Sequence, residues 1–308
     1  MKKASLLLLS LLLCISALLI PAAGCNTDSQ EGFEGVTITD DLGREVTIET
    51  EPMKIVSLAP SNTEILFALG LGDRVVGVTD ICDYPDEALD IEKVGGYSGV
   101  DIEKIVAIDP DLILAEDLHK TEVIPALEDL GFTVVAIVPY TLQETMDSIK
   151  LIGELTGTEE TAAQIVDDME QSLEAITDVT EGITQEEKVK VLYVIWHDPI
   201  YSVGSDTRIH ELIEMAGGIN IAEVAGEGYP TLTLEEIVAI NPGVIIVNDD
   251  VPLDAILNES RLSDVDAVVN GMVYSINADL TNRPTPRIIE GLELMAEMIH
   301  PELFGSAE

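Results

Sequence analysis

The sequence is short of basic residues, and this shortage excludes one class of partner. The chain contains 15 Lys and Arg but 58 Asp and Glu, which gives a formal net charge of −43 over 308 residues. Nucleic-acid binding needs a basic surface, because Lys and Arg neutralise the phosphates. We therefore exclude nucleic acid as a partner and interpret most of the acidic residues as a solvated surface.

Histidine is also scarce, which argues against a bare metal site. The four histidines are His119, His197, His210 and His300. None of them pairs with another at the i, i+4 spacing that places two ligands on one helix face. We predict no directly bound metal, and we expect His210 and His300 to be ordinary helix residues.

Motifs that carry catalysis are missing as well. The chain has no G-x-S-x-G nucleophile elbow, no phosphate-binding loop and no G-x-G-x-x-G after a strand. Cys82 together with His119 or His197 leaves a thiol nucleophile open as an alternative, although a lone cysteine in an apolar loop is ordinarily inert. We therefore predict that the protein is not an enzyme.

Long apolar runs are confined to the N-terminus, where they indicate export. Lys2 and Lys3 precede an apolar run over residues 5–20, and small residues follow it up to Gly24. This pattern predicts a signal peptide over residues 1–24. A retained transmembrane anchor is the alternative, but the run is short for a membrane span.

Cysteine is rare, and the three positions differ in their expected fate. Cys14 leaves with the signal peptide. The small residues that end in Cys25 resemble a lipobox, although Ala22 stands where Leu is favoured. We predict lipidation of Cys25, a lipid-linked tether over residues 25–35, and an extracytoplasmic protein anchored to the cell membrane. A Cys25–Cys82 disulfide is the alternative.

One segment of the sequence occurs twice. Residues 100–115 and 232–247 are identical at seven of sixteen positions, and a tyrosine precedes each copy, Tyr97 and Tyr229. A separation of 132 residues exceeds the periods of solenoid repeats. The repeat therefore indicates two similar lobes, and the cleft between them is the first place to expect a ligand.

The pattern of the rest of the chain agrees with two lobes. Strands alternate with helices over residues 36–140 and again over 187–308, which predicts two mainly parallel α/β lobes. Residues 141–186 have helical periodicity and few strand signals, so we expect a helical connector there. Gly153 and Gly157 are expected to break it into two helices.

Three helix starts carry capping signals. Residues 61–64 (SNTE) match a capping box, and Asp101 and Thr233 are N-cap candidates for the two repeat helices. Glu103 and Glu235 then fall in the first turns. By itself this position needs no further explanation, because acidic side chains stabilise the helix dipole there.

Four segments together resemble a known family. They are similar to segments of the substrate-binding proteins of ABC importers for cobalamin, ferric siderophores and haem. The four segments are KIVSLAPSNTEILFALGLGDRVVGVTD, CDYP, VGGY and DIEKIVAIDPDLI. The resemblance extends from about Val36 to the C-terminus. It implies two Rossmann-like α/β lobes joined by one long backbone helix, with the ligand cleft between the lobes. It also implies a permease homodimer with its ATPase subunits as the partner, and no intrinsic cofactor.

The resemblance gives the two first-turn acids a second role. Family members present one exposed glutamate on each lobe to arginines of the two permease subunits. The matching positions here are Glu103 and Glu235.

The resemblance also implies a set of cleft residues. By motif, the ligand-binding candidates are Ile81, Cys82, Tyr97, Glu116, His119, Trp196, His197, Tyr229, Asp279 and Arg283. His119 or His197 could supply an axial ligand to a metal inside the transported molecule. Tyr84 is left open between a cleft-lining and a structural role.

The ligand expected from this resemblance is a corrinoid of the cobalamin type. Aromatic residues make up only 4% of the chain, and Ile81, Glu116 and Leu280 replace cleft aromatics of the cobalamin receptors, so stacking is reduced. Ferric siderophores and haem are the alternatives. Anionic siderophores suit a cleft with several cations, and only Arg283 and Arg208 are placed to help.

Overall fold

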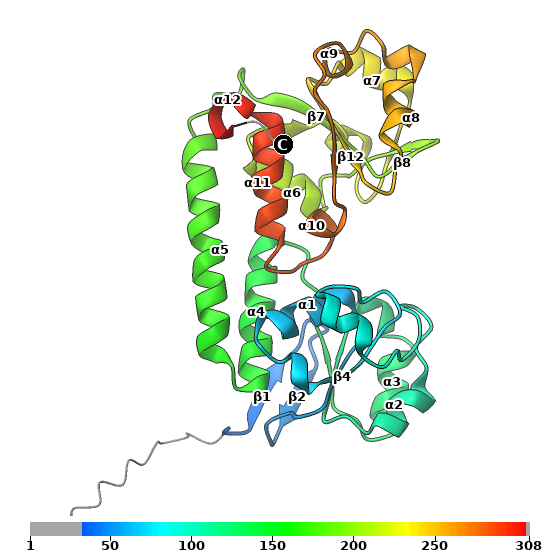
Figure 1. Cartoon of the computed structure of the whole chain (residues 1–308), viewed down its shortest axis with the longest axis vertical. Coiled ribbons are helices and arrows are strands. Elements are labelled where there is room, and N and C mark those ends of the chain that lie inside the picture. Colours follow the sequence, from blue (N-terminus) through cyan, green and yellow to red (C-terminus); the bar gives the residue numbers. More distant parts are fainter. Residues whose placement is uncertain (1–32, 306–308) are drawn as a thin grey trace, which may run out of the picture. The chain divides into compact units, whose positions relative to one another are not determined.

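Two four-stranded parallel sheets form the centres of two α/β lobes in the computed structural model, which describes residues 33–305 (Figure 1). The first sheet has the strand order β4-β3-β5-β6 and the second β10-β7-β12-β13. The first comprises β3 (Ile55–Ser57), β4 (Val75–Val78), β5 (Leu112–Ala115) and β6 (Val134–Ala136), and the second β7 (Val189–Val194), β10 (Gly218–Asn220), β12 (Val244–Asn248) and β13 (Val273–Ile276). This arrangement confirms the predicted fold class.

Helices cover both sheets, as parallel sheets require. Every residue of β5 and β12 is buried, because each sheet has packed side chains on both faces. The first lobe has α1 (Pro60–Ala68), α2 (Ile102–Ile108) and α3 (Val123–Asp129). The second has α6 (Arg208–Met215), α7 (Leu234–Ile240), α8 (Leu253–Leu257), α9 (Asp266–Val269), α10 (Asp279–Asn282), α11 (Ile288–Ile299) and α12 (Pro301–Phe304).

Two smaller antiparallel sheets complete the strands. Residues 36–48 form an antiparallel hairpin of β1 (Val36–Thr39) and β2 (Glu45–Ile48). The other sheet, β11-β9-β8, was not predicted; it contains β8 (Trp196–His197), β9 (Ile200–Tyr201) and β11 (Thr231–Leu232). The central strand β7 ends at Val194, and the chain then turns into the hairpin of β8 and β9.

The connector consists of two packed helices, α4 (Leu142–Thr156) and α5 (Glu159–Thr180). Gly157 ends α4 in the left-handed conformation, as expected. Gly153 does not break the helix: a Cβ there would lie 2.6 Å from the Ala162 Cβ, so glycine lets the two helices approach closely. The 22 residues of α5 extend about 33 Å at 1.5 Å per residue and reach from the first lobe to the second (Figure 1).

One hydrophobic cluster connects the lobes through these helices. It includes Ile149 of α4, Val166 of α5 and Leu292 of α11, and it extends to Ile55 in the first sheet and Val191 in the second. Two further clusters fill the opposite faces of the two sheets. The helical connector is therefore part of the core rather than a free linker.

The capping predictions have different outcomes. The side chains of Asp101 and Thr233 cap α2 and α7, as expected. The capping box at residues 61–64 is wrong, because α1 begins two residues earlier than predicted, at Pro60, with Ala59 rather than Ser61 as its N-cap. Glu64 therefore lies within the helix and is free for other contacts.

The signal peptide and Cys25 lie outside the described residues. Of the predicted tether, only residues 33–35 are described. Within the part of the chain that the structure describes, no helix combines the length and the apolar character that a membrane span needs.

Candidate functional site

A cavity of about 790 Å³ lies between the two lobes. Such a volume falls within the range of small-molecule sites. Its walls come from loops that follow the strands of both sheets. The first lobe contributes Pro60, Ser61, Ile81, Tyr97, Glu116 and residues 117–118 and 137–140, and the second contributes Ile195, residues 206–209, Gly228, Tyr229, Asn248 and residues 281–284.

Glu116 is the centre of the first-lobe wall. It follows β5 directly, so its carboxylate emerges at the carboxyl edge of the sheet. The Ser61 hydroxyl donates to Oε1 at 2.9 Å, and the Tyr97 hydroxyl donates to Oε2. Burial and the neighbouring negative charge of Glu116 raise the pKa of Tyr97. The carboxylate is thus held in place by two hydroxyl groups before any ligand arrives.

His119 lies behind this wall and not in the cavity. Its Nδ1 accepts the Glu116 backbone N–H at 3.1 Å, so Nε2 carries the proton and donates to the Tyr97 carbonyl at 2.8 Å. The side chain is fully buried, and burial lowers its pKa. With both ring nitrogens engaged, His119 has no lone pair for a metal. The expectation that it contacts the ligand is corrected.

Arg208 supplies a positive charge to the second-lobe wall. Its guanidinium donates to the Asn282 carbonyl at 2.9 Å and to the Pro139 carbonyl of the other lobe. The buried Nε has no hydrogen-bond partner among the residues that the structure describes. Burial lowers the pKa of Arg208. A guanidinium at a cavity wall is suited to an anionic group of a ligand.

Tyrosines reach the cavity from both lobes. Tyr97 and Tyr229, the two tyrosines that precede the repeated segments, both line it, as does Tyr140. Tyr140 and Tyr229 are about 60% exposed, so their rings are available to a ligand. The sequence prediction missed Tyr140, although its position just after β6, at the carboxyl edge of the first sheet, was a usable signal.

Arg283 lines the cavity and is fixed by carboxylates. Its Nη1 donates to Glu64 at 2.9 Å and to Asp83 at 2.8 Å, and its Nε lies 2.9 Å from Asp279. Burial opposes the charge, but the contacts with Asp83 and Glu64 raise the pKa of Arg283. Asp279 does not line the cavity itself; it orients Arg283.

Of the other predicted ligand-binding residues, Ile81 lines the cavity. Three more, Cys82, Trp196 and His197, do not line it. Cys82 is fully buried, with its Sγ 3.2 Å from Thr63 and 3.1 Å from Thr79, so its expected contact with the ligand is corrected. Its alternative partner, Cys25, lies outside the described residues.

Trp196 and His197 are the other two. The chain leaves the sheet after Val194, so Ile195 faces the cavity while the next two residues enter β8. Trp196 donates its indole N–H to the Asp198 carbonyl, and His197 lines a separate cavity of about 490 Å³ in the second lobe. Their assignment to the cleft is therefore corrected.

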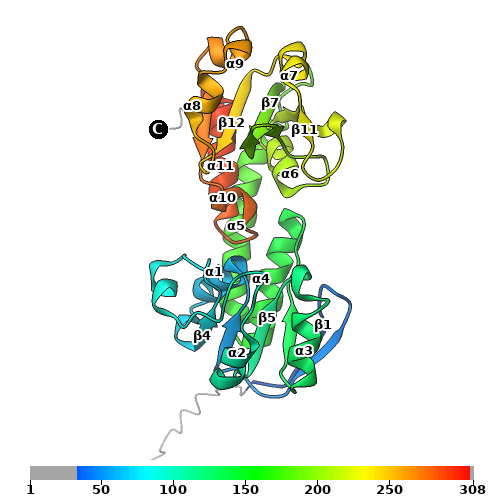
Figure 2. The same cartoon turned by 90° about the vertical axis from the view of Figure 1, so that its right-hand side faces the viewer.

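Glu103 and Glu235 occupy equivalent exposed positions. Each is the second residue of its helix, α2 or α7, and both side chains are exposed. Each helix has seven residues, and buried, half-buried and exposed positions follow in the same order in both. In Figure 2, α2 lies at the lower end of the first lobe and α7 at the upper end of the second.

One group of side chains has the composition of a metal site. Ligand atoms of His210, Glu214 and Glu223 lie within 4.8 Å of one another. However, Asn220 contacts His210 Nδ1 through its amide nitrogen, and Lys188 lies 3.3 Å from Glu214. An amide donor on the imidazole and an ammonium on the carboxylate both oppose a cation, so we assign no metal here.

The fold and the cavity define a two-lobed protein with a space of small-molecule size between its lobes. The family model described as "Periplasmic binding protein" matches residues 55–280, and the chain belongs to this family. The match covers both sheets and nearly all of the cavity wall.

Relatives of known name agree with this assignment. The chain is 40% identical over 274 residues to the uncharacterized ABC transporter substrate-binding lipoprotein YvrC of Bacillus subtilis, covering 87% of each chain. The solved periplasmic vitamin B12 binding protein BtuF of Vibrio cholerae has a TM-score of 0.69 at 30% identity, covering 80% of this chain and 96% of that one. A possible iron-binding periplasmic protein from Staphylococcus epidermidis has a TM-score of 0.71 at 28% identity, covering 82% and 100%.

Proposed function

We propose that the protein is the substrate-binding component of an ABC importer and that its ligand is a corrinoid of the cobalamin type. The observation that carries this proposal is the inter-lobe cavity, whose two walls each present tyrosine to the same space. Family membership supports the transport role, and the similarity to a vitamin B12 binding protein supports the ligand.

The cavity chemistry suits a large, flat and nearly neutral ligand. Tyrosine rings pack against planar macrocycles and keep a hydroxyl for amide side chains, which a corrin carries around its rim. Tyr140 and Tyr229 offer such rings on opposite lobes. The positive charge of Arg208 at the cavity wall suits the one phosphodiester of a complete cobalamin.

Arg208 also supports the second candidate, a ferric siderophore or haem. Both kinds of ligand carry carboxylates or other anionic oxygens, which a guanidinium recognises directly. The possible iron-binding relative from Staphylococcus epidermidis agrees with this alternative. Under either proposal the metal arrives inside the ligand, the protein has no resident cofactor, and no side chain acts catalytically.

Delivery requires a partner at the membrane. We propose that Glu103 and Glu235 each contact one subunit of a permease homodimer that works with its ATPase subunits. Exposed ion pairs of this kind guide orientation and association rate more than affinity. A lipid on Cys25 would hold the protein outside the cytoplasm and beside the permease, as the name of the Bacillus subtilis lipoprotein suggests.

Calorimetric titration tests the ligand. We expect cyanocobalamin to bind the purified protein at submicromolar Kd, and dicyanocobinamide, which lacks the phosphodiester, to bind more weakly. Tyr140→Ala and Tyr229→Ala should each weaken cyanocobalamin binding about 3- to 10-fold through lost aromatic packing. Tyr274→Phe, which alters a tyrosine outside the cavity, is the matched control.

The same panel includes haemin and two ferric siderophores. Absence of heat with both corrinoids would overturn the corrinoid assignment. If a ferric complex or haemin then bound, and Arg208→Met weakened that binding, the second candidate would replace the first.

A further inference from the structure

Glu64 is a buried carboxylate that the transport role does not explain. It projects from α1 in the first lobe, and its side chain is only 2% exposed. A buried carboxylate is unfavourable unless cations and hydrogen bonds compensate it. Both cations that do so here come from the second lobe, more than 200 residues away along the chain.

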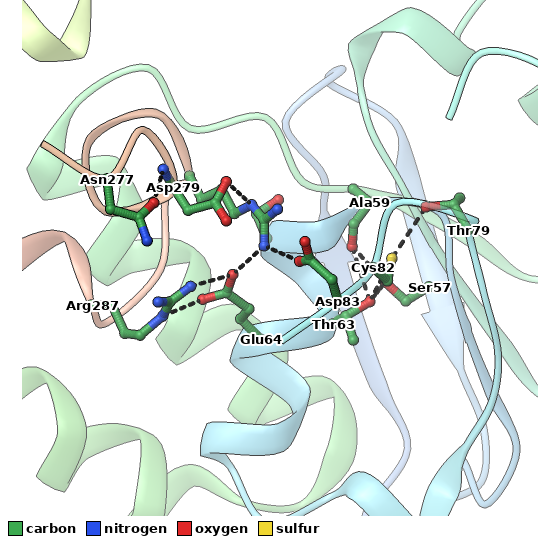
Figure 3. A network of polar contacts seen from close by, with 12 residues as sticks. Ser57, Ala59, Thr63, Glu64, Thr79, Cys82, Asp83, Asn277, Asp279 and Arg287 are labelled. Carbon is green, nitrogen blue, oxygen red and sulfur yellow. Dashed lines mark hydrogen bonds and ion pairs between the residues drawn. The ribbon is translucent and has the colours of Figure 1, made fainter. Parts of the chain in front are cut away.

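Two arginines use both oxygens of this carboxylate. Arg287, at the start of α11, donates from Nε to Oε2 and from Nη2 to Oε1, each at 2.9 Å. This is the bidentate geometry in which arginine binds carboxylates most strongly. Arg283 adds a third bond, from Nη1 to Oε1, also at 2.9 Å. Figure 3 shows Glu64 held by Arg287 on one side and by the guanidinium that also meets Asp83 on the other.

The surrounding residues fix the arginines from both lobes. Asp83 of the first lobe and Asp279 of the second bind Arg283. The guanidinium carbon of Arg287 lies 3.6 Å from the ring centroid of Tyr84, a cation–π contact with the first lobe. Tyr84 therefore has a structural role and is not among the cavity-lining residues. We call the set of Glu64, Asp83, Tyr84, Asp279, Arg283 and Arg287 the inter-lobe cluster.

The inter-lobe cluster lies next to the cavity. Pro60 and Ser61 of α1 line the cavity, and Glu64 is one helical turn further along. Likewise Arg283 and Pro284 line it, and Arg287 follows a few residues later. The cluster thus lies beside the cavity, and a cavity-lining arginine is one of its members.

Separating the lobes at this cluster would leave the Glu64 carboxylate and the Arg287 guanidinium without these partners, whereas Arg283 would keep only Asp279. These ion pairs therefore oppose separation of the two lobes at the cluster. Elsewhere, where only solvent lies between the lobes, the cleft can widen. We propose that Glu64 is a positioning residue: it clamps the lobes together beside the cavity and holds Arg283 at the cavity wall. This inference rests on the proposed function only in taking the cavity as the ligand site.

The clamp can be tested without any ligand, by pulsed electron paramagnetic resonance. Spin labels at Asp129→Cys and Asn270→Cys, both exposed and on different lobes, report the inter-lobe distance in a Cys25→Ser background. We expect a narrow distance distribution for the parent protein and a broader one for Glu64→Gln, which keeps the shape of the side chain but removes its charge. Glu122→Gln, an exposed acid outside the cluster, should leave the distribution unchanged.

Two further measurements separate clamping from general damage. Hydrogen exchange of β5 and β12 should stay as slow in Glu64→Gln as in the parent, because each lobe keeps its own core. Arg287→Lys keeps the charge but loses the bidentate geometry, so it should broaden the distribution less than Glu64→Gln. It also serves as the test variant if Glu64→Gln does not fold.

Ligand binding gives the second readout. With cyanocobalamin as the test molecule, Glu64→Gln should raise Kd at least 10-fold. Unchanged distance distributions in Glu64→Gln and Arg287→Lys would overturn the clamp whatever the ligand is. Broadened distributions together with no cyanocobalamin binding by the parent protein would uphold the clamp and overturn the corrinoid assignment instead.

Discussion

The two lobes share a framework and differ where they face the cavity. Their sheets have the same strand order, and the helix before the third strand begins with a side-chain cap and ends in a left-handed residue in both. Lys54 and Lys190 each donate to the last carbonyls of that helix. None of the residues that form these caps and contacts lines the cavity.

At the cavity the same backbone carries different chemistry. Glu116 in the first lobe and Asn248 in the second follow the equivalent strand positions, and both line the cavity. In both lobes the backbone N–H three residues later donates to the carbonyl of this residue at 2.9 Å, from His119 to Glu116 and from Val251 to Asn248. One lobe thus places ionisable groups where the other has an amide and a valine. The comparison indicates that the framework sets the position of the cavity, and that substitutions at the strand ends set its chemistry.

The largest expected effect concerns the proposed docking residues. In cells that carry the cognate importer, Glu103→Ala and Glu235→Ala should each lower uptake about 10-fold, and the double variant should abolish it, because each removes one charge contact with a permease subunit. Calorimetric binding of the ligand should not change.

Glu122→Ala is the control for that experiment. Equal losses from the two single variants would show that the lobes dock equivalently. Normal uptake by the double variant would contradict the docking proposal.

The next effect tests whether the repeated helices are anchored equally. Ile105 and Ile237 occupy the same repeat position and are fully buried. Alanine at either should lower the free energy of unfolding by about 2–5 kcal/mol, because it leaves a cavity in the core. Urea denaturation measures the loss. Val106→Ala and Val238→Ala, one residue later and exposed, are the controls and should cost about 0.5 kcal/mol or less. Clearly different losses from Ile105→Ala and Ile237→Ala would argue against equal anchoring.

The smallest effect is a pH dependence confined to the first lobe. Burial lowers the pKa of His119 below its ordinary value of 6.5, so the unfolded chain binds more protons than the folded one below about pH 6.5. Its contribution to stability is complete above that pH and is lost as the pH falls towards the folded pKa.

His119 alone can change the free energy of unfolding by at most about 1.4 kcal/mol per pH unit. His119→Gln should flatten the dependence of the unfolding free energy on pH between 6.5 and 5. If the free energy of unfolding of the variant changed with pH as steeply as that of the parent, His119 would not be the source of this pH dependence.

Much of the framework was predictable from the sequence. Buried runs such as residues 112–115, the caps at Asp101 and Thr233, and the end of α4 at Gly157 are short-range features, so a few neighbouring residues define them. The repeat located both lobes, and its tyrosines proved to lie at the cavity. Tyr97, Tyr229 and Glu116, which the family resemblance gave as ligand-binding candidates, all line the cavity, and their contact with a ligand stays a prediction.

Errors arose where the chain changes direction. Trp196 and His197 follow a strand that continues in the sequence pattern, but the chain turns after Val194 into the β8 hairpin. His119 and Cys82 stand in loops beside the cavity, yet their side chains point inward to backbone and hydroxyl partners. Side-chain direction in a loop depends on tertiary packing, which no local pattern encodes.

The sequence by itself determined the two-lobed α/β architecture, because periodicity and caps act over a few residues and the repeat marks both lobes. The family followed from the resemblance of its motifs. Only the tertiary structure decided which side chains share the cavity and which join the lobes beside it. Glu64 shows the difference most clearly. In the sequence it completed a capping box with Ser61, whereas in the structure it binds Arg283 and Arg287, 219 and 223 residues further along the chain. Contacts at that separation depend on how the lobes pack, and the energy of burying a charge selects them.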